Sequence, residues 1–313
     1  MTTLGARPAG VLLMTYGSPS SLDDVERYLA AVRGGRPAEP ALVTEFRRRY
    51  SVIGGSPLVA ITRRQAESLE ARFGGDVVVR AAMRFSEPMI ETVLGELAGL
   101  DVGRAVAIVM SPQYSPLLMG GYGRALHAAA AVVGTTAPSV EVAGAWYREP
   151  AFVDAMALHV RDRLVEIAGA EGTEPAVLLT AHSLPRRVAD AEPEYLAQLR
   201  ESADLIAARA GLDADRWRFC WQSAGHEPGE WMSPDFADLM PELRSRGFRS
   251  VLVAPIQFLA DHLEILYDVD VGARQQAEAA GLLFHRIASL NVDARFIDAL
   301  EAVVREELAT VPG

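Results

Sequence analysis

A nine-residue segment occurs twice in the chain and constrains its fold more than any other feature. VLLMTYGSP at residues 11–19 returns as VLLTAHSLP at residues 177–185. Each copy has the pattern of a short buried strand that runs into a Pro/Ser/Gly turn. In open α/β sheets, ligands bind at the carboxyl ends of such strands. Tyr16 and His182 occupy this position in the two copies, so we expect both to face a shared ligand cleft.

A second, weaker repeat supports the same division. IVMSPQYS at 108–115 resembles VLVAPIQFL at 251–259, because both read as an apolar strand followed by proline, glutamine and an aromatic residue. A length of 313 residues also favours about two domains. We therefore predict two copies of one unit, a lobe at 1–147 and a lobe at 148–313.

Strand-like and helical segments alternate along the whole chain. This alternation is typical of parallel sheets with right-handed crossovers, so we predict an α/β fold with two similar Rossmann-like lobes, each with a four-stranded parallel sheet flanked by helices. No linker separates the lobes, and the last helix is therefore expected to pack on the N-terminal lobe. The expected strands lie near residues 10–16, 77–83, 104–110, 140–146, 175–181, 217–222, 249–255 and 281–287. The expected helices cover residues 21–32, 40–50, 59–73, 87–99, 118–133, 149–168, 193–210, 235–246, 260–279 and 292–309.

Composition narrows the functional class. The first ten residues lack the pattern of a signal peptide, and no apolar run approaches the ~20 residues of a membrane span, so a cytoplasmic protein without an integral membrane segment is expected. A net charge of −11 argues against a nucleic-acid partner. The common glycine motifs of nucleotide-binding proteins and hydrolases are absent. The single cysteine, Cys220, is expected to be a buried structural thiol and cannot hold an iron–sulfur cluster alone, so no permanently bound cofactor is predicted.

Two segments of the second half carry candidate chemistry. His182, at a strand end, can accept a proton or bind a metal, and its alternative is a histidine satisfied by backbone groups. In APIQFLADHLEILYDVD at 254–270, Asp261, Glu264 and Asp268 recur at i, i+3 and i+7, which predicts three carboxylates on one helical face. Such a face binds a cation or is simply solvated. Because the helix begins just after a strand, we place Glu264 in the cleft.

The first half contains an arginine cluster in an otherwise acidic protein. Arginine binds carboxylates bidentately, so the cluster could hold a polyanionic small molecule. For at least four of the seven arginines we expect only pairing with nearby acids on exposed helices. The neighbouring IGGSPL at 53–58 would let a flat ligand approach the backbone closely. The cluster consists of Arg33, Arg36, Arg47, Arg48, Arg49, Arg63 and Arg64.

Five segments together resemble the ferrochelatase family in order and spacing. They are VLLMTYGSP, RYSVIGGSPL, LLTAHSLP, CWQSAGHEPGEWMSP and FLADHLEILYD, which are distributed from residue 11 to residue 268. The chain is most similar to the short bacterial branch, the coproporphyrin III ferrochelatases. This resemblance implies the two-lobed class II chelatase fold and insertion of ferrous iron into coproporphyrin III, which gives Fe-coproporphyrin III (coproheme) in haem biosynthesis.

The resemblance also implies roles for individual residues. His182 matches a metal ligand and proton acceptor, Glu264 its partner carboxylate, and Asp268 a further carboxylate on the metal path. Tyr16 matches the tyrosine that approaches the iron from the other face of the macrocycle. The chain departs from its relatives at Gly34, where a second basic residue is common, and at Gly272, where another carboxylate is common. The positions that match contacts to coproporphyrin are Arg33, Arg49, Tyr50, Ser56 and Tyr122.

Other functions share parts of this pattern. A protoporphyrin IX ferrochelatase would need an apolar mouth, and a cobalt or nickel chelatase of another tetrapyrrole should lack the Tyr16 and IGGSPL contacts. A non-catalytic porphyrin or haem carrier would need neither His182 nor Glu264. The presence of both residues favours the enzyme. The implied partners are the porphyrin and ferrous iron, with room for a transient contact with the next enzyme of the haem pathway.

Overall fold

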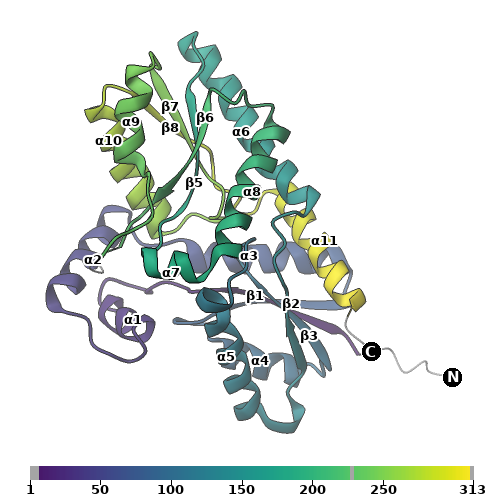
Figure 1. Cartoon of the computed structure of the whole chain (residues 1–313). Helices are drawn as coiled ribbons and strands as arrows, with labels where there is room; N and C mark the ends of the chain where they lie inside the picture. Colours follow the sequence, from purple (N-terminus) through teal and green to yellow (C-terminus); the bar gives the residue numbers. More distant parts are fainter. Residues whose placement is uncertain (1–6, 226–228, 311–313) are drawn as a thin grey trace. The chain divides into compact units, whose positions relative to one another are not determined.

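The computed structural model describes residues 7–225 and 229–310, which form two compact units. Of these described residues, unit 1 comprises those at 7–110, 116–146 and 291–310, and unit 2 comprises those at 111–115, 147–225 and 229–290. Each unit holds one four-stranded parallel sheet, in the order β2-β1-β3-β4 in unit 1 and β6-β5-β7-β8 in unit 2 (Figure 1). The predicted fold class is therefore confirmed. No helix among the described residues is long and apolar enough to cross a membrane.

The sheet of unit 1 is built around β1, whose seven residues are all buried. A central parallel strand is covered by helices on both faces, which explains its continuous apolar sequence. Thr15 pairs with Met83 of β2, and Met14 pairs with Val109 of β3, so these three strands end at the same edge. The strands are β1 (Ala9–Thr15), β2 (Val77–Met83), β3 (Arg104–Val109) and β4 (Ser139–Val142).

The helices of unit 1 come from both ends of the chain. The C-terminal helix α11 (Ala294–Thr310) contacts α3 and β3, and Phe296 stacks on Trp146 at a centroid distance of 6.4 Å. The remaining helices are α1 (Val25–Val32), α2 (Pro40–Val52), α3 (Leu58–Glu70), α4 (Ile90–Gly99) and α5 (Pro116–Val133), with 3₁₀ turns η1 (Ala71–Phe73) and η2 (Gly134–Thr136).

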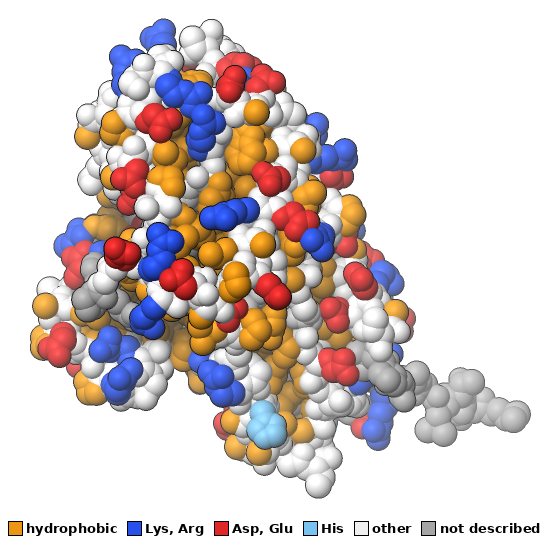
Figure 2. Space-filling view, in the orientation of Figure 1, with side chains coloured by type: hydrophobic (Ala, Val, Ile, Leu, Met, Phe, Trp, Pro, Cys, Tyr) orange, Lys and Arg blue, Asp and Glu red, His pale blue; other side chains and the backbone are white. Residues whose placement is uncertain are grey.

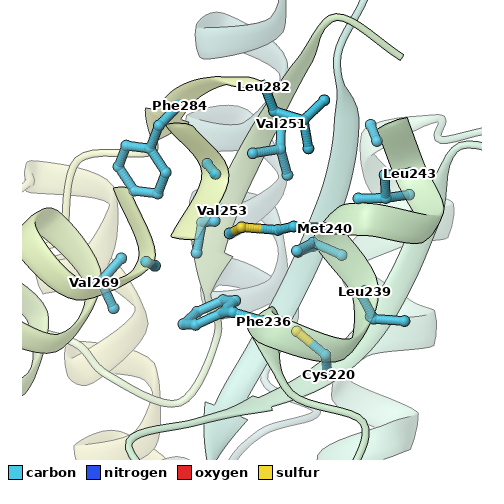
Figure 3. Close-up of a cluster of buried hydrophobic side chains, with 14 of the residues drawn as sticks. Cys220, Phe236, Leu239, Met240, Leu243, Val251, Val253, Val269, Leu282 and Phe284 are labelled. Atoms are coloured by element: carbon cyan, nitrogen blue, oxygen red, sulfur yellow. The ribbon is translucent and has the colours of Figure 1, made fainter. Parts of the chain in front are cut away.

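Unit 2 repeats this plan around β5, as the internal repeat predicts. Its strands are β5 (Ala176–His182), β6 (Trp217–Gln222), β7 (Ser250–Pro255) and β8 (Leu283–Arg286). Its helices are α6 (Pro150–Glu171), α7 (Arg186–Ala191), α8 (Pro193–Ala210), α9 (Phe236–Ser245) and α10 (Arg274–Ala279), and a π-helical segment, η3, covers Glu264–Ala273. Figure 3 shows how Met240 of α9, Val251 and Val253 of β7 and Val269 of η3 pack into one core on this sheet.

The predicted strands all form, with ends that shift by a few residues. Two helical features differ from the sequence prediction. The short α7 was not expected, because six residues are too few to show a helical period. The predicted helix at 260–279 begins only at Leu263 and is a π-helix up to Ala273. Basic and acidic side chains are interspersed on the face shown in Figure 2, unlike the basic stripe typical of nucleic-acid-binding proteins.

Candidate active site

His182 is the last residue of β5, and neighbouring segments fix its backbone. Its N–H donates to Oε1 of Gln257 at 2.8 Å, and the amide nitrogen of Gln257 is hydrogen bonded to the hydroxyl of Tyr195. Gln257 follows β7, the strand beside β5. Gln257, the glutamine in the second copy of the weaker repeat, therefore has a positional role, because it fixes the backbone at the strand end that carries His182.

The hydrogen bonds of the His182 ring determine its tautomer. Nδ1 lies 2.5 Å from the carbonyl oxygen of Ser183. A carbonyl can only accept, so Nδ1 carries the proton and the neutral ring keeps its lone pair on Nε2. Nε2 lies 3.6 Å from Oε2 of Glu264, and 29% of the side chain is exposed. The backbone thus satisfies only one ring nitrogen, and the other is left as a proton acceptor or metal ligand.

Glu264 is the first residue of the π-helix η3, and one of its carboxylate oxygens stands out. Its Oε2 is shielded from solvent, and no described residue donates a hydrogen bond to it. Leaving a buried carboxylate oxygen unpaired costs free energy, so an atom of this kind calls for an explanation, such as a catalytic role or a bound water or ion. π-Helical segments are likewise rare and frequent at functional sites. The arrangement fits a group that receives a proton or a cation.

A second imidazole, which the sequence analysis did not assign, lies beside this pair. Nδ1 of His262 lies 2.9 Å from the carbonyl oxygen of Ala260, so its Nε2 also keeps the lone pair, 4.0 Å from Oε2 of Glu264. The Phe258 ring packs edge-on against both imidazoles. The sequence DHLE at 261–264 places His262 two positions before Glu264, but only the structure shows that its Nε2 lies near the carboxylate. Within the described ranges, no group of three His, Cys, Asp or Glu side chains is arranged to hold a metal ion.

The expectation of three carboxylates on one α-helical face is wrong. Asp261 precedes the helix, accepts a hydrogen bond from Oγ of Ser289 at 2.7 Å and lies 3.5 Å from Nη1 of Arg286. A neutralised carboxylate of this kind is poorly suited to receive a substrate cation. Glu264 and Asp268 remain on the segment, four residues apart in a helix whose hydrogen bonds span five residues, and Asp268 is half-buried.

The segment after β6 returns to the loop that follows His182. Oγ of Ser183 donates to the carbonyl of Met232 at 3.1 Å, and the Met232 N–H donates to the carbonyl of Leu184 at 2.9 Å. These bonds explain why the 220–234 segment accompanies the histidine strand in the sequence pattern. Residues 226–228 of that segment lie outside the described residues.

In unit 1, Tyr16 stands directly after β1 on an aromatic base. Its ring stacks on Tyr122 at 5.8 Å and meets the edge of Phe85 at 5.2 Å, and 44% of the residue is exposed. The guanidinium carbon of Arg84 lies 5.8 Å from the Tyr16 ring centre and 5.6 Å from that of Tyr122. Burial raises the pKa of the Tyr122 phenol well above its ordinary value, so Tyr122 stays protonated. Tyr16 is therefore the exposed member of this stack.

The turn after Tyr16 requires glycine. Gly17 has a φ of +83°, and a Cβ there would lie 2.1 Å from Oγ of Ser86. That hydroxyl accepts the N–H of Ser18, and the Tyr28 hydroxyl donates to the carbonyl of Gly17 at 3.0 Å. The Pro/Ser/Gly turn of the repeat therefore fixes the direction in which the chain leaves the strand beside Tyr16.

Unit 1 also contains a pocket of about 860 Å³, a volume typical of small-molecule sites. Tyr50 and Ser56 line it together with the loop after β1 and the start of α3, whereas Arg33 and Arg49 do not. Arg33 is exposed and forms no ion pair within the described part of the chain. Nε of Arg49 donates to Oε1 of Glu45 at 2.8 Å.

The acids near the arginine cluster already engage several of its members. Hydrogen bonds from Arg48 and then Arg49 lower the pKa of Glu45 to about 2, so this carboxylate is ionised at any physiological pH. Nη2 of Arg47 lies 3.5 Å from Oε2 of Glu26. These three arginines therefore have intramolecular partners in the free protein, and a ligand carboxylate would have to compete with them.

Comparison with known proteins shows that nearly the whole chain matches one protein family. The model of the family described as Ferrochelatase matches residues 8–308. The chain is 36% identical to a coproporphyrin III ferrochelatase of Geobacillus thermodenitrificans over 98% of both chains, and 35% identical to a ferrochelatase of Deinococcus radiodurans over 99% of this chain and 100% of that protein. Among solved structures, it resembles the sirohydrochlorin chelatase SirB of Bacillus subtilis subspecies spizizenii in complex with cobalt, with a TM-score of 0.57, 12% identity, and coverage of 96% of this chain and 94% of that chain. The last likeness concerns the fold alone.

Proposed function

Because the chain belongs to the ferrochelatase family, a family of metal chelatases, we propose that it inserts ferrous iron into coproporphyrin III to form Fe-coproporphyrin III. The observation that carries the proposal is a pair of acceptors, Nε2 of His182 and Oε2 of Glu264, which lie 3.6 Å apart and receive no hydrogen bond from any residue that the structure describes. Several relatives at about 35% identity are named for coproporphyrin III, which supports this porphyrin over other tetrapyrroles.

Insertion exchanges two protons for one divalent ion. Two pyrrole N–H bonds break, the ring nitrogens bind the iron, and the two protons must leave as the iron sheds its waters. His182 is the first proton acceptor in this scheme, because its Nδ1–H donates to Ser183 and its Nε2 keeps a lone pair that no described residue uses in a hydrogen bond. Oε2 of Glu264, within 4.0 Å of both His182 and His262, accepts a proton from either imidazole and restores the neutral ring.

The same side chains suit weak, exchangeable binding of the iron substrate. Imidazole and carboxylate are acceptable but not exceptionally strong ligands for ferrous iron. We assign Glu264, with Asp268 four residues further along η3, to the path of metal and protons.

Unit 1 supplies the groups for the porphyrin in this proposal. The exposed ring of Tyr16, held by Tyr122 and Phe85, offers a phenol to one face of the macrocycle. Tyr50 and Ser56 line the pocket, and Arg33 provides an uncommitted cation for a propionate. A porphyrin that is held at its periphery can be bent out of plane, and bending exposes the lone pairs of the ring nitrogens. The binding energy of the propionates compensates for the free energy that this distortion costs.

We expect a preference for coproporphyrin III over protoporphyrin IX. Coproporphyrin carries four propionates, protoporphyrin two propionates and two apolar vinyl groups. Two additional carboxylate–arginine pairs at partly exposed sites would give roughly tenfold to thirtyfold discrimination. The measurement is kcat/KM for both porphyrins in detergent-free buffer at moderate salt, for the wild type and for Arg33→Ala. Arg33→Ala should reduce the coproporphyrin value selectively. A preference for protoporphyrin, or a coproporphyrin preference unaffected by Arg33→Ala and by salt, would contradict the charge argument.

Cys220 is expected to be dispensable for activity. It is fully buried in β6 opposite Thr180, and burial raises the pKa of its thiol well above the ordinary value, so it is neither a nucleophile nor a ready metal ligand. Cluster ligation normally needs four cysteines. Anaerobically purified protein should contain no acid-labile sulfide, and Cys220→Ser should metallate the porphyrin at close to the wild-type rate. Stoichiometric sulfide would overturn this assignment.

A further inference from the structure

One of the two arginines that line the pocket of unit 1 has no charged partner among the described residues. Its charged lining residues are Asp24, Arg27, Arg63 and Glu87. Arg27 donates to both carboxylate oxygens of Asp24, at 2.5 and 2.9 Å, and this bond lowers the pKa of Asp24. Glu87 accepts the backbone N–H of Met89 at 3.1 Å. The guanidinium of Arg63 forms no hydrogen bond or ion pair with any residue that the structure describes.

Arg63 lies on the face of α3 that borders the pocket. Val59, Ala60 and Arg63 line it, at spacings that place them on one side of a helix, whereas Thr62, Gln65, Ala66 and Leu69 are buried on the side that packs into unit 1. Arg64 is also exposed, but it is turned by about 100° around the helix and does not line the pocket. The helix therefore directs one of two adjacent arginines toward the pocket.

We propose that Arg63 binds a carboxylate substituent of the tetrapyrrole and contributes to the recognition of a highly carboxylated porphyrin. This inference rests on the proposed function. The Asp24–Arg27 pair is internally neutral and Glu87 repels anions, so Arg63 is the lining residue that favours a carboxylate. A guanidinium can bind it through two parallel hydrogen bonds. Relatives commonly have a second basic residue after Arg33, where this chain has Gly34. Arg63 would supply a cation in its place.

The test measures porphyrin binding in the absence of iron, by fluorescence titration, with Arg63→Gln and the matched control Arg64→Gln. We expect Arg63→Gln to raise the Kd for coproporphyrin III about fivefold, the effect of an ion pair worth ~1 kcal/mol, and to make binding less sensitive to salt. Arg64→Gln should leave the Kd within about twofold, and Arg63→Lys should recover part of the affinity. The affinity for a porphyrin with two carboxylates should change less.

A second variant tests the same contact with Arg63 still in place. Ala60→Glu places a carboxylate three residues before Arg63 on the pocket side of α3, where it would pair with the guanidinium and weaken coproporphyrin binding in the same way. If Arg63→Gln and Ala60→Glu bind coproporphyrin like the wild type, or if Arg64→Gln is equally impaired, Arg63 is not a substrate contact. Wild-type iron insertion is scored separately. If the wild type does not insert iron, the proposed function is refuted. If the wild type inserts iron but the Arg63→Gln and Ala60→Glu variants bind coproporphyrin normally, only the role of Arg63 is refuted.

Discussion

His182→Ala should abolish catalysed iron insertion while the protein still binds the porphyrin. The variant removes Nε2, the ring nitrogen that forms no hydrogen bond with the backbone of the described residues. A positioned proton acceptor typically raises the reaction rate by about 10²- to 10⁴-fold. Porphyrin affinity should change little, because the tyrosines and arginines proposed to bind the ring all belong to unit 1. The measurement is the initial rate of insertion with ferrous iron under anaerobic conditions, together with the Kd of the metal-free porphyrin.

His127→Ala is the matched control for this experiment. His127 is exposed on α5, and its substitution should leave both the rate and the Kd unchanged. Added imidazole should restore part of the activity of His182→Ala, because the cavity left by the ring can admit a free base. Near-normal turnover in a folded His182→Ala variant would show that His182 is satisfied by backbone bonds and has no role in the chemistry.

Glu264→Gln should reduce turnover by about 10²-fold or more with little loss of porphyrin affinity. The amide keeps the shape of the side chain and removes the charge from an oxygen that no described residue pairs. Because an unpaired, shielded carboxylate is costly in the folded state, the variant should be at least as stable as the wild type. Thermal unfolding and insertion rates, measured on the same preparation, check both parts.

The control for Glu264→Gln is Glu278→Gln on α10, an exposed position that should tolerate the change without effect. Reduced activity accompanied by a clearly lower unfolding temperature in Glu264→Gln alone would mean that the carboxylate supports the start of the π-helix. Reduced activity with unchanged stability assigns it to the path of protons and metal.

The sequence predicts the fold well because its strands are buried on both faces. The segments of β1 and β5 are largely apolar runs that end in Pro/Ser/Gly turns, and both become central strands that are buried throughout, except for His182 at the end of β5. Pattern analysis fails where the period is short or unusual. The six residues of α7 span less than two turns, and a π-helix has no signature in an analysis that assumes the α-helical period.

The candidate site is predictable only in part, for a related reason. The repeat singles out Tyr16 and His182 by their place at strand ends, and the parallel sheet puts them there. Of the three carboxylates only Asp261 departs from the prediction, because the α-helical period aligns it with Glu264, whereas the structure pairs Asp261 with Ser289 and Arg286. Which nitrogen of His182 is free depends on a contact to Ser183, which spacing cannot reveal.

Catalysed insertion of iron by the unmodified protein is the most direct test of the account. The protein is loaded anaerobically with coproporphyrin III, ferrous iron is added, and the Soret and Q bands are followed against a protein-free control. We predict that the free-base spectrum converts to that of the iron complex much faster than in the control, with the rate lost in His182→Ala and Glu264→Gln. Tight porphyrin binding with insertion no faster than in buffer would contradict the account and identify the protein as a porphyrin carrier.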